Sequence, residues 1–408
     1  MSHKMINRPK AGQIEKCDYG WSSAFWLSSI AFNRLVNSAI PAFRTLIIFV
    51  ATIAAASPLV AQAPPDQKSG NSETSLSDPD FHIQGEYAGS MTLAGCCRPV
   101  GVQVVANGEG RFQAIIYRGG LPGNGFDGLV RYTLTGARSG EQVVLGGENL
   151  VILLQQGFAA VVRSAEGVRL GFLQPVKRLS ARQGARPPSN SIVLFDGKNT
   201  DRLLNAKVTD DGLLEIGCET KEAYQNFTLH AEFRTPWLPL ARGQNRGTSG
   251  FYLQKRYEVQ VLDSFGLDPQ FNDCGSLYKF KAPAVNMCFP PLRWQTYDID
   301  FNAPQFSKDG QRTCKARITV RHNGVLIHNR LELDNKTGGG SIEGPNPLPI
   351  LLQNHGNPVH FRNLWLIDHD RSDIRFSSNV EENSPDRTEP ILRQTDFLRG
   401  QNMRRADG

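Results

Sequence analysis

The sequence predicts an all-β protein in which a small β-rich domain precedes a larger two-sheet jelly roll. The 408 residues include 39 Gly and 24 Pro, and short β-rich runs alternate with turn residues. Few stretches show a helical period. About ten strand-like runs follow residue 190 with no helical pattern between them, which is typical of a jelly roll.

Residues 1–63 have the pattern of an export leader. Arg44 precedes the apolar run Thr45–Ala56, and an A-x-A pattern follows at Ala61 and Ala63. This run is short for a membrane span, which needs about 20 apolar residues. We therefore expect a periplasmic or extracellular protein with no transmembrane domain once the leader is cleaved. A retained signal anchor in the membrane is the alternative.

The first folded domain is predicted over residues 81–180, after a Pro/Ser/Asp-rich linker at residues 64–80. Within it, Gly101–Val105 and Phe112–Tyr117 flank a Gly-rich turn, which predicts a β-hairpin. This domain carries no recognisable catalytic pattern. We interpret it as an accessory module.

The second domain is predicted over residues 191–368, after a proline-punctuated linker at residues 181–190. Its Asn323-Gly324 dipeptide predicts a tight hairpin. Residues 369–408 are charged and polar and are predicted to be disordered. The domain begins with a strand and a turn over Ser191–Asn199, and further strand candidates are Leu213–Ile216, Phe227–Arg234, Thr248–Gln254, Tyr257–Leu262, Thr296–Phe301, Ala316–His322, Val325–Leu331, Ile350–Gln353 and Val359–Ile367.

The charge of the chain gives no reason to expect a nucleic-acid partner. The net charge is +6, but the leader carries a surplus of four positive charges, which leaves +2 for residues 64–408. No basic stripe interleaved with aromatic residues occurs in the sequence.

The seven cysteines have no metal-ligand spacing, because no C-x-x-C motif occurs. In an exported protein, Cys274 and Cys288 are the favoured disulfide pair because they share one loop-rich region. The alternative, in which every thiol is free, stays open.

The strand candidate at Tyr257–Leu262 has one apolar and one polar face. In an extended chain Val259 and Val261 point to one side, and Glu258 and Gln260 point to the other. A buried face therefore supports two polar side chains about 7 Å apart. A plain half-exposed strand with solvated acidic residues is the alternative interpretation.

Asp263 follows this strand five residues after Glu258 and should face the core. A β-bulge near Val261 and Leu262 would return it to the polar side, and bulges are frequent beside active sites. The resulting E-x-Q-x-x-D pattern is similar to the E-x-D-x-x-E pattern of laminarinase-type jelly-roll glycanases. It lacks the middle carboxylate of that pattern, which argues against an ordinary glycosidase pair.

Seven short motifs occur in order over residues 191–368. They are LFDGK at 194–198, GTSG at 247–250, YEVQVLD at 257–263, GSLY at 275–278, RWQTY at 293–297, LQNHG at 352–356 and VHFRN at 359–363. Together they resemble the 3-keto-disaccharide hydrolase family, in the two-domain arrangement found in planctomycetes. The resemblance implies a concanavalin A-like jelly roll that acts on sugars with a ketone at C3.

The chemistry of such a substrate explains what the site must contain. A C3 ketone acidifies the C2 proton, so a base can remove that proton and expel the C1 aglycone by elimination, after which water adds back. The site needs this base, a group that holds the enolate oxygen, and an acid at the leaving group. The resemblance thus implies a carbohydrate-active hydrolase or lyase that cleaves the glycosidic bond of 3-keto sugars.

The resemblance also assigns roles to residues. Glu258 and His355 are the expected proton-handling groups, with Asp263 as a third catalytic candidate. A divalent metal, which the chemistry does not require, could be held by Glu258, Asp263 and Gln353. The expected substrate-binding residues are Gln260, Gln353, Asn354, Tyr278, Trp294 and Arg246, with Tyr278 and Trp294 stacking on the sugar ring.

Two positions depart from the family pattern. Asn354 stands where an aspartate usually precedes the histidine, and Thr248 stands where an asparagine usually precedes Ser-Gly. An amide at position 354 cannot supply a negative charge to His355 or to a metal ion.

The alternative function is a non-catalytic, lectin-like carbohydrate-binding protein. The same jelly roll and the same polar face would serve it. The two functions differ at Glu258 and His355, because a lectin tolerates amide replacement of a base and an enzyme does not. A conventional glycanase ranks third because Gln260 replaces a carboxylate.

Overall fold

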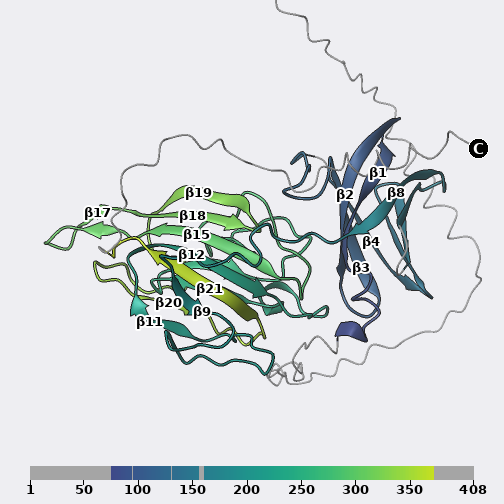
Figure 1. Cartoon of the computed structure of the whole chain (residues 1–408). Helices are drawn as coiled ribbons and strands as arrows, with labels where there is room; N and C mark the ends of the chain where they lie inside the picture. The colour runs from purple at the N-terminus through teal and green to yellow at the C-terminus, as the bar shows by residue number, and fades with distance from the viewer. Residues whose placement is uncertain (1–74, 94, 130, 156–159, 372–408) are drawn as a thin grey trace, which may run out of the picture. The chain divides into compact units, whose positions relative to one another are not determined.

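The computed structural model describes residues 75–93, 95–129, 131–155 and 160–371, and these residues form an all-β protein (Figure 1). The sheets are a closed barrel, a five-stranded sheet, a six-stranded sheet and a two-stranded ribbon. Within these residues no helix is long and apolar enough to cross a membrane. The predicted leader and the segment 372–408 lie outside the described residues.

The first domain is an eight-stranded antiparallel barrel, in which β8 returns to pair with β1. The predicted hairpin is confirmed, since Val100–Ala106 pair with Phe112–Arg118. Closure leaves the barrel no free sheet edge. Its strands are β1 (Gly85–Leu93), β2 (Cys96–Ala106), β3 (Arg111–Arg118), β4 (Arg131–Ser139), β5 (Gln142–Gly147), β6 (Leu150–Gln155), β7 (Ala160–Ser164) and β8 (Arg169–Val176).

The second domain is a sandwich of two sheets, as the jelly-roll prediction requires. The five-stranded sheet has the order β10 (Leu203–Leu204), β11 (Glu219–Ala223), β20 (Pro349–Leu352), β13 (Ser249–Leu253) and β14 (Tyr257–Val261). The six-stranded sheet has the order β19 (Val325–Leu333), β18 (Ala316–His322), β15 (Gln295–Asn302), β12 (Asn226–Arg234), β21 (His360–Asp368) and β9 (Ile192–Phe195). The ribbon pairs β16 (Gln305–Phe306) with β17 (Arg312–Cys314).

Most of the predicted strands of this domain are confirmed within one or two residues. The prediction for Leu213–Ile216 is wrong, because Leu214 makes only isolated bridges to Val208 and Phe361. Strand β11, between β10 and β20, was not predicted, since ETKEA lacks β-branched and aromatic residues apart from one Thr. The Asn323-Gly324 hairpin is confirmed, with positive φ of 52° and 82° joining β18 to β19.

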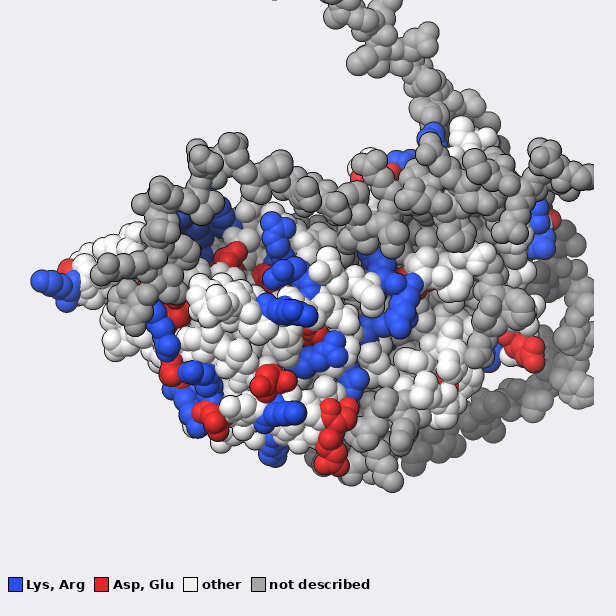
Figure 2. Space-filling view, viewed as in Figure 1, with Lys and Arg blue, Asp and Glu red and all other residues white. Residues whose placement is uncertain are grey.

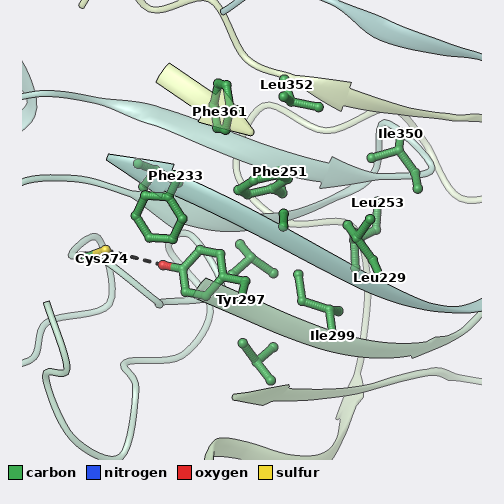
Figure 3. Packing of buried hydrophobic residues seen from close by; sticks show 14 of the residues in the cluster. Leu229, Phe233, Phe251, Leu253, Cys274, Tyr297, Ile299, Ile350, Leu352 and Phe361 are labelled. Carbon is green, nitrogen blue, oxygen red and sulfur yellow. Dashed lines mark hydrogen bonds between the residues drawn. The ribbon is translucent and has the colours of Figure 1, made fainter. Parts of the chain in front are cut away.

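Aromatic side chains fill the space between the two sheets (Figure 3). Phe233 and Tyr297 of the six-stranded sheet have ring centroids 4.7 Å apart, and Phe251 of the other sheet lies 5.9 Å from Tyr297. The Tyr297 hydroxyl is 3.3 Å from Cys274 Sγ. This packing fixes which face of each sheet is left for polar residues.

The favoured disulfide is not formed in the structure. Cys274 and Cys288 are buried free thiols. The other cysteines of the described residues are free as well. Cys288 Sγ lies 3.4 Å from the Leu262 carbonyl oxygen, within the sandwich core.

The segment predicted as the second linker lies against the outer face of the six-stranded sheet. Ser180 Oγ is 2.7 Å from Thr296 Oγ1, and the Ala185 carbonyl accepts hydrogen bonds from Asn363 and Trp365. We call Ser180–Ala185 the strap. The barrel, which precedes the strap in the sequence, and the sandwich, which follows it, belong to one compact unit.

Under the strap lies a buried cluster of charged residues. His230 Nδ1 is 2.8 Å from Asp298 Oδ1, and its ring stacks on Trp365. Burial alone would lower the pKa of His230, but hydrogen bonds to Asp298 and Glu232 outweigh it and raise the pKa. Glu232 accepts hydrogen bonds from Gly184 N, Asn363 Nδ2 (2.9 Å) and Arg362 Nε (2.8 Å).

Charges of both signs are interspersed over the sandwich on the face seen in Figure 2. Lysine and arginine side chains lie beside aspartate and glutamate side chains there. This arrangement agrees with the small net charge of the chain outside its leader.

Candidate active site

The outer face of the five-stranded sheet carries two rows of side chains. β13 and β14 pair in register, with Tyr252 opposite Glu258 and Gly250 opposite Gln260. Val259 and Val261 lie in the core, so the prediction that Glu258 and Gln260 share the other face is confirmed.

The loop after β14 and strand β20 extend both rows. Leu277 bridges Val259, which places Tyr278 beside Glu258 and Ser276 beside Gln260. On the other side, Leu351 of β20 lies opposite Tyr252, and the backbone N–H of Gln353 donates to the Gly250 carbonyl. One row is therefore Tyr278, Glu258, Tyr252 and Leu351, and the next is Ser276, Gln260, Gly250 and Gln353.

Glu258 is the unusual member of this face. Its side chain is almost fully buried, at 1% exposure, yet its Oε2 atom has no hydrogen-bond partner among the described residues. Burial raises the pKa of Glu258 to about 7, although a hydrogen bond from Tyr252 acts in the opposite direction. A buried carboxyl group that titrates near neutrality is typical of general acid–base sites.

Two glycines make room for this carboxyl group. A Cβ atom at Gly250 would lie 2.5 Å from Glu258 Oε1 and 2.9 Å from its Cγ. A Cβ atom at Gly338 would lie 2.5 Å from the Tyr278 ring and 3.5 Å from Glu258 Oε2. Glu258 therefore leans over Gly250, beneath the glycine-rich segment that includes Gly338.

This segment, Thr337–Gly340, is held against β14 by hydrogen bonds. Thr337 Oγ1 accepts the backbone N–H of Glu258 at 2.6 Å, and Thr337 N donates to the Arg256 carbonyl at 3.0 Å. We call Thr337–Gly340 the glycine cover. It is one of the elements that hide Glu258 from solvent.

Amide side chains surround the carboxyl group. The Gln260 amide is 3.0 Å from Glu258 Oε1 when its nitrogen faces the carboxyl, and it is 2.8 Å from Gln244. Gln244 lies on the short 3-10 turn Gly243–Asn245. The Ser276 hydroxyl and Gln353 Oε1 are buried without partners among the described residues. Unpaired polar atoms at such a site are free to bind a polar ligand.

Asp263 lies outside this group. The β13–β14 ladder is regular and β14 ends at Val261, so the predicted bulge is not part of it. Asp263 Oδ2 instead accepts from Arg246 Nε at 2.7 Å, and both residues are buried. The Arg246 guanidinium also contacts the Ala106 carbonyl of the barrel at 3.3 Å. The structure thus places Asp263 and Arg246 in a buried ion pair beside the barrel.

His355 and Asn354 lie in the loop between β20 and β21. Both are exposed, and Asn354 Oδ1 accepts the backbone N–H of Gly356 at 3.0 Å. His355 makes no hydrogen bond or ion pair with any residue that the structure describes. The same loop reaches β13, since Asn357 Oδ1 accepts the backbone N–H of Thr248 at 2.8 Å.

Trp294 lies directly before β15 of the six-stranded sheet. The Arg362 guanidinium carbon stands 4.0 Å from the centroid of its ring and that of Arg234 stands 5.2 Å away. Arg234 and Arg362 belong to β12 and β21, on the face opposite the core residues Phe233 and Phe361. The structure therefore separates Trp294 from Glu258, while it keeps Tyr278 beside Glu258.

The three residues considered for a divalent metal are not gathered as one ligand set. Among the described residues no group of three His, Cys, Asp or Glu side chains has the arrangement of a metal site. Asp263 already has its charge balanced by Arg246. Glu258 and Gln353, on one face, would be left as oxygen ligands, so the set as found does not fit a metal ion.

Sequence analysis missed Tyr252, Gln244 and Ser276. Tyr252 could have been found from the hairpin register, because it is the cross-strand neighbour of Glu258. Gln244 and Ser276 sit on irregular segments with no periodic signal.

Comparisons with known proteins agree with the motif resemblance. Residues 190–367 match the 3-keto-alpha-glucoside-1,2-lyase-like domain family. A candidate glycosyl hydrolase of Parabacteroides distasonis with a solved structure is 32% identical, with 48% of this chain and 93% of that chain covered and a TM-score of 0.43. No curated protein matches the chain.

Two further solved structures of candidate glycosyl hydrolases from the same organism are more distant. One is 24% identical, with 43% of this chain and 98% of that chain covered and a TM-score of 0.30. The other is 17% identical, with 47% and 99% covered and a TM-score of 0.33. On the family match and the 32% identical relative, this chain belongs, through residues 190–367, to the 3-keto-disaccharide hydrolase family.

Proposed function

We propose that this protein is a carbohydrate-active enzyme that cleaves the glycosidic bond of 3-keto sugars, by removal of the C2 proton, elimination of the C1 aglycone and hydration. The family supports a glycoside as the substrate class, and its relatives are described as candidate glycosyl hydrolases. The rest of the proposal depends on the side chains around Glu258.

The observation that carries the proposal is the state of Glu258. A base that removes a proton from carbon works best when its pKa is near the working pH, and the pKa of Glu258 is raised to about 7. Its unpartnered Oε2 is available to accept that proton. Its burial keeps the charge poorly solvated and therefore reactive.

An ordinary glycosidase mechanism is less well supported. Most glycosidases use two carboxyl groups that flank the scissile bond. On the outer face of the five-stranded sheet, the amide Gln260 stands where the glycanase pattern has its middle carboxylate, and the charge of Asp263 is balanced by Arg246. Elimination from a 3-keto sugar needs only one carboxylate as base.

The remaining groups have roles that follow from their chemistry. Gln260 and Gln353 would donate and accept hydrogen bonds with sugar hydroxyls, and Tyr278 would pack against the ring. His355, in the exposed loop after β20, would protonate the leaving group. Arg246 and Asp263 would fix the loop that carries Gln244, and Asn354 would fix the turn that carries His355.

A lectin-like binding protein is the second candidate. The cluster of amide side chains, Gln244, Gln260 and Gln353, favours it, since amides bind sugar hydroxyls without any chemistry. In that case the raised pKa of Glu258 would have no catalytic consequence.

The test uses the purified protein with a chromogenic 3-keto-glucoside and, in parallel, its unoxidised parent. We expect aglycone release from the keto sugar alone. Release from the parent at a similar rate would favour a conventional glycosidase. Binding of either sugar without release would favour the lectin function. A parallel sample with a chelator tests whether a divalent metal takes part.

Export also stays a prediction, because the leader lies outside the described residues. N-terminal sequencing of the protein from fractionated cells tests it. A new N-terminus near residue 64 in the exported fraction is expected, and an intact leader in the membrane fraction would favour the signal anchor.

A further inference from the structure

We propose that the Tyr252 hydroxyl is a catalytic group of this site: it donates the hydrogen bond that stabilises the enolate oxygen when Glu258 removes the C2 proton. This proposal rests on the proposed function. It assigns the second of the three roles that elimination from a 3-keto sugar requires.

The position of Tyr252 is set by the sheet. Tyr252 and Glu258 are directly opposite each other on β13 and β14, and their side chains share the outer face. Cross-strand neighbours have Cβ atoms about 5 Å apart. The C2 hydrogen and the C3 oxygen of the substrate belong to adjacent carbons. A base and a donor that serve these two atoms must therefore be neighbours, as Glu258 and Tyr252 are.

The hydroxyl is a neutral donor in this environment. Tyr252 is 6% exposed, and burial, the charge of Glu258 and a hydrogen bond to Glu258 all raise its pKa. The phenol therefore keeps its proton at neutral pH. The side-chain amide of Gln260, the other neighbour of Glu258, is already hydrogen-bonded to Gln244 at 2.8 Å, so the Tyr252 hydroxyl is the better donor to the substrate.

During the reaction the negative charge passes from Glu258 to the C3 oxygen of the substrate, and a single rotating hydroxyl can hydrogen-bond to each in turn. Before the reaction the negative charge is on Glu258, and the Tyr252 hydroxyl donates to it. When the C2–H bond breaks, its proton goes to Glu258 and its electrons form the C2–C3 double bond, so the C3 carbonyl oxygen takes the charge. The hydroxyl can then rotate from Glu258 to that oxygen. When the C3 carbonyl re-forms, C1–C2 becomes a double bond and the C1–O bond to the aglycone breaks.

The glycine cover lies close to both Tyr252 and Glu258. A Cβ atom at Gly339 would lie 3.5 Å from the Tyr252 hydroxyl, and one at Gly338 would lie 3.5 Å from Glu258 Oε2. The same segment therefore lies over both groups. A substrate that displaces it meets the base and the donor together.

The experiment compares wild type with Tyr252→Phe, and uses Tyr224→Phe as the matched control. Tyr224 is another buried tyrosine whose hydroxyl lies 3.4 Å from a carboxylate, that of Glu222, away from this site. Two rates are measured over a range of pH: aglycone release from a 3-keto-glucoside, and C2 proton exchange in D₂O of 1,5-anhydro-3-ketoglucitol, which has no leaving group at C1.

We expect Tyr252→Phe to lower both rates about 10²- to 10³-fold, the usual loss when one donor to a developing oxyanion is removed. The acidic limb of its pH profile should move to higher pH, because the hydrogen bond that lowers the pKa of Glu258 is gone. Tyr224→Phe should keep both rates within about threefold and the limb unmoved. A loss of rate with an unmoved limb would indicate a structural effect and overturn the proposal.

The outcomes also separate this proposal from the proposed function. An active wild type with an equally active Tyr252→Phe overturns the role of Tyr252 alone. A wild type that neither releases aglycone nor exchanges the C2 proton overturns both. If Tyr252→Phe lacks the near-UV circular dichroism of wild type, 3-fluorotyrosine at position 252 replaces it. That variant keeps the hydroxyl and changes its acidity, so an unchanged rate and limb would again overturn the proposal.

Discussion

Glu232 and Glu258 lie on the outer faces of the two sheets of the sandwich, and both are almost fully buried. Burial alone would raise the pKa of either residue. Glu232 has hydrogen-bond donors from β12, β21 and the strap, and they lower its pKa to about 2. Glu258 has little such support, and its pKa is raised to about 7.

The difference between the two glutamates shows how a structural carboxylate is told from a reactive one. Residue type and burial are the same, so neither identifies the site. The supply of donors differs: Glu232 is fully paired under the strap, while Glu258 keeps a free oxygen under the glycine cover. Protein interiors rarely leave a charged group unpaired unless a ligand or a reaction uses it.

The largest expected effect is a loss of turnover in the Glu258 variant that does not occur in the Glu232 variant. Glu258→Gln should lower kcat for a 3-keto-glucoside about a thousandfold, because the base is lost, while the free energy of unfolding at pH 7 stays the same or rises. Glu232→Gln should keep kcat and lower the free energy of unfolding by about 2–3 kcal/mol, because Arg362 loses its partner. Equal losses of turnover in the two variants would remove the distinction.

A smaller effect is expected in how pH changes stability. Glu258 has a folded pKa above its ordinary value of 4.5, so it costs no stability below pH 4.5, and it costs up to about 3 kcal/mol as pH rises toward 7. Glu232 has a folded pKa of about 2, so it contributes about 3 kcal/mol above pH 4.5 that is lost as pH falls toward 2.

Denaturant unfolding of wild type, Glu258→Gln and Glu232→Gln from pH 3 to pH 8 measures the pH-dependent contributions of Glu258 and Glu232 to stability. Relative to wild type, Glu258→Gln should gain stability as pH rises from 4.5 to 7. The deficit of Glu232→Gln should shrink below pH 4.5. Parallel curves for the three proteins would contradict the opposite pKa shifts.

The smallest expected effect concerns the room that Gly250 leaves for Glu258. Gly250→Ala places a methyl group 2.5 Å from Glu258 Oε1, so the carboxyl must move, and kcat should fall about ten- to a hundredfold with the fold retained. Gly146→Ala on barrel strand β5 is the control, because no atom lies within 4 Å of its added Cβ. Steady-state kinetics and circular dichroism of both variants test this, and an unaffected Gly250→Ala would show that the position of Glu258 is not critical.

The sequence predicted the parts of this site that depend on local periodicity. Glu258 and Gln260 alternate with Val259 and Val261, so their shared face followed from the strand period of two. Tyr252 could not be placed beside Glu258, because the hairpin register depends on positive φ at Gln254 and Lys255, neither of which is glycine.

The parts that depend on distant contacts were not predictable. Trp294 and Tyr278 look alike in sequence as ring-stacking candidates, but the loops that carry them lead to different sheets. Asp263 belongs to the family motif with Glu258, yet Arg246, seventeen positions earlier, draws it toward the barrel. The eight-stranded closure of the first domain likewise depends on pairing between β1 and β8, which are far apart in the chain.

The strap has a consequence for where this protein can be cut. The family match begins at residue 190, but Glu232 and Trp365 of that domain bond to Gly184 and Ala185, which lie before it. A fragment that starts at the family boundary would expose Trp365 and leave Glu232 short of a donor. For recombination or gene fusion, the segment that keeps the sandwich domain intact therefore begins near Ser180, before the start of the family match at residue 190.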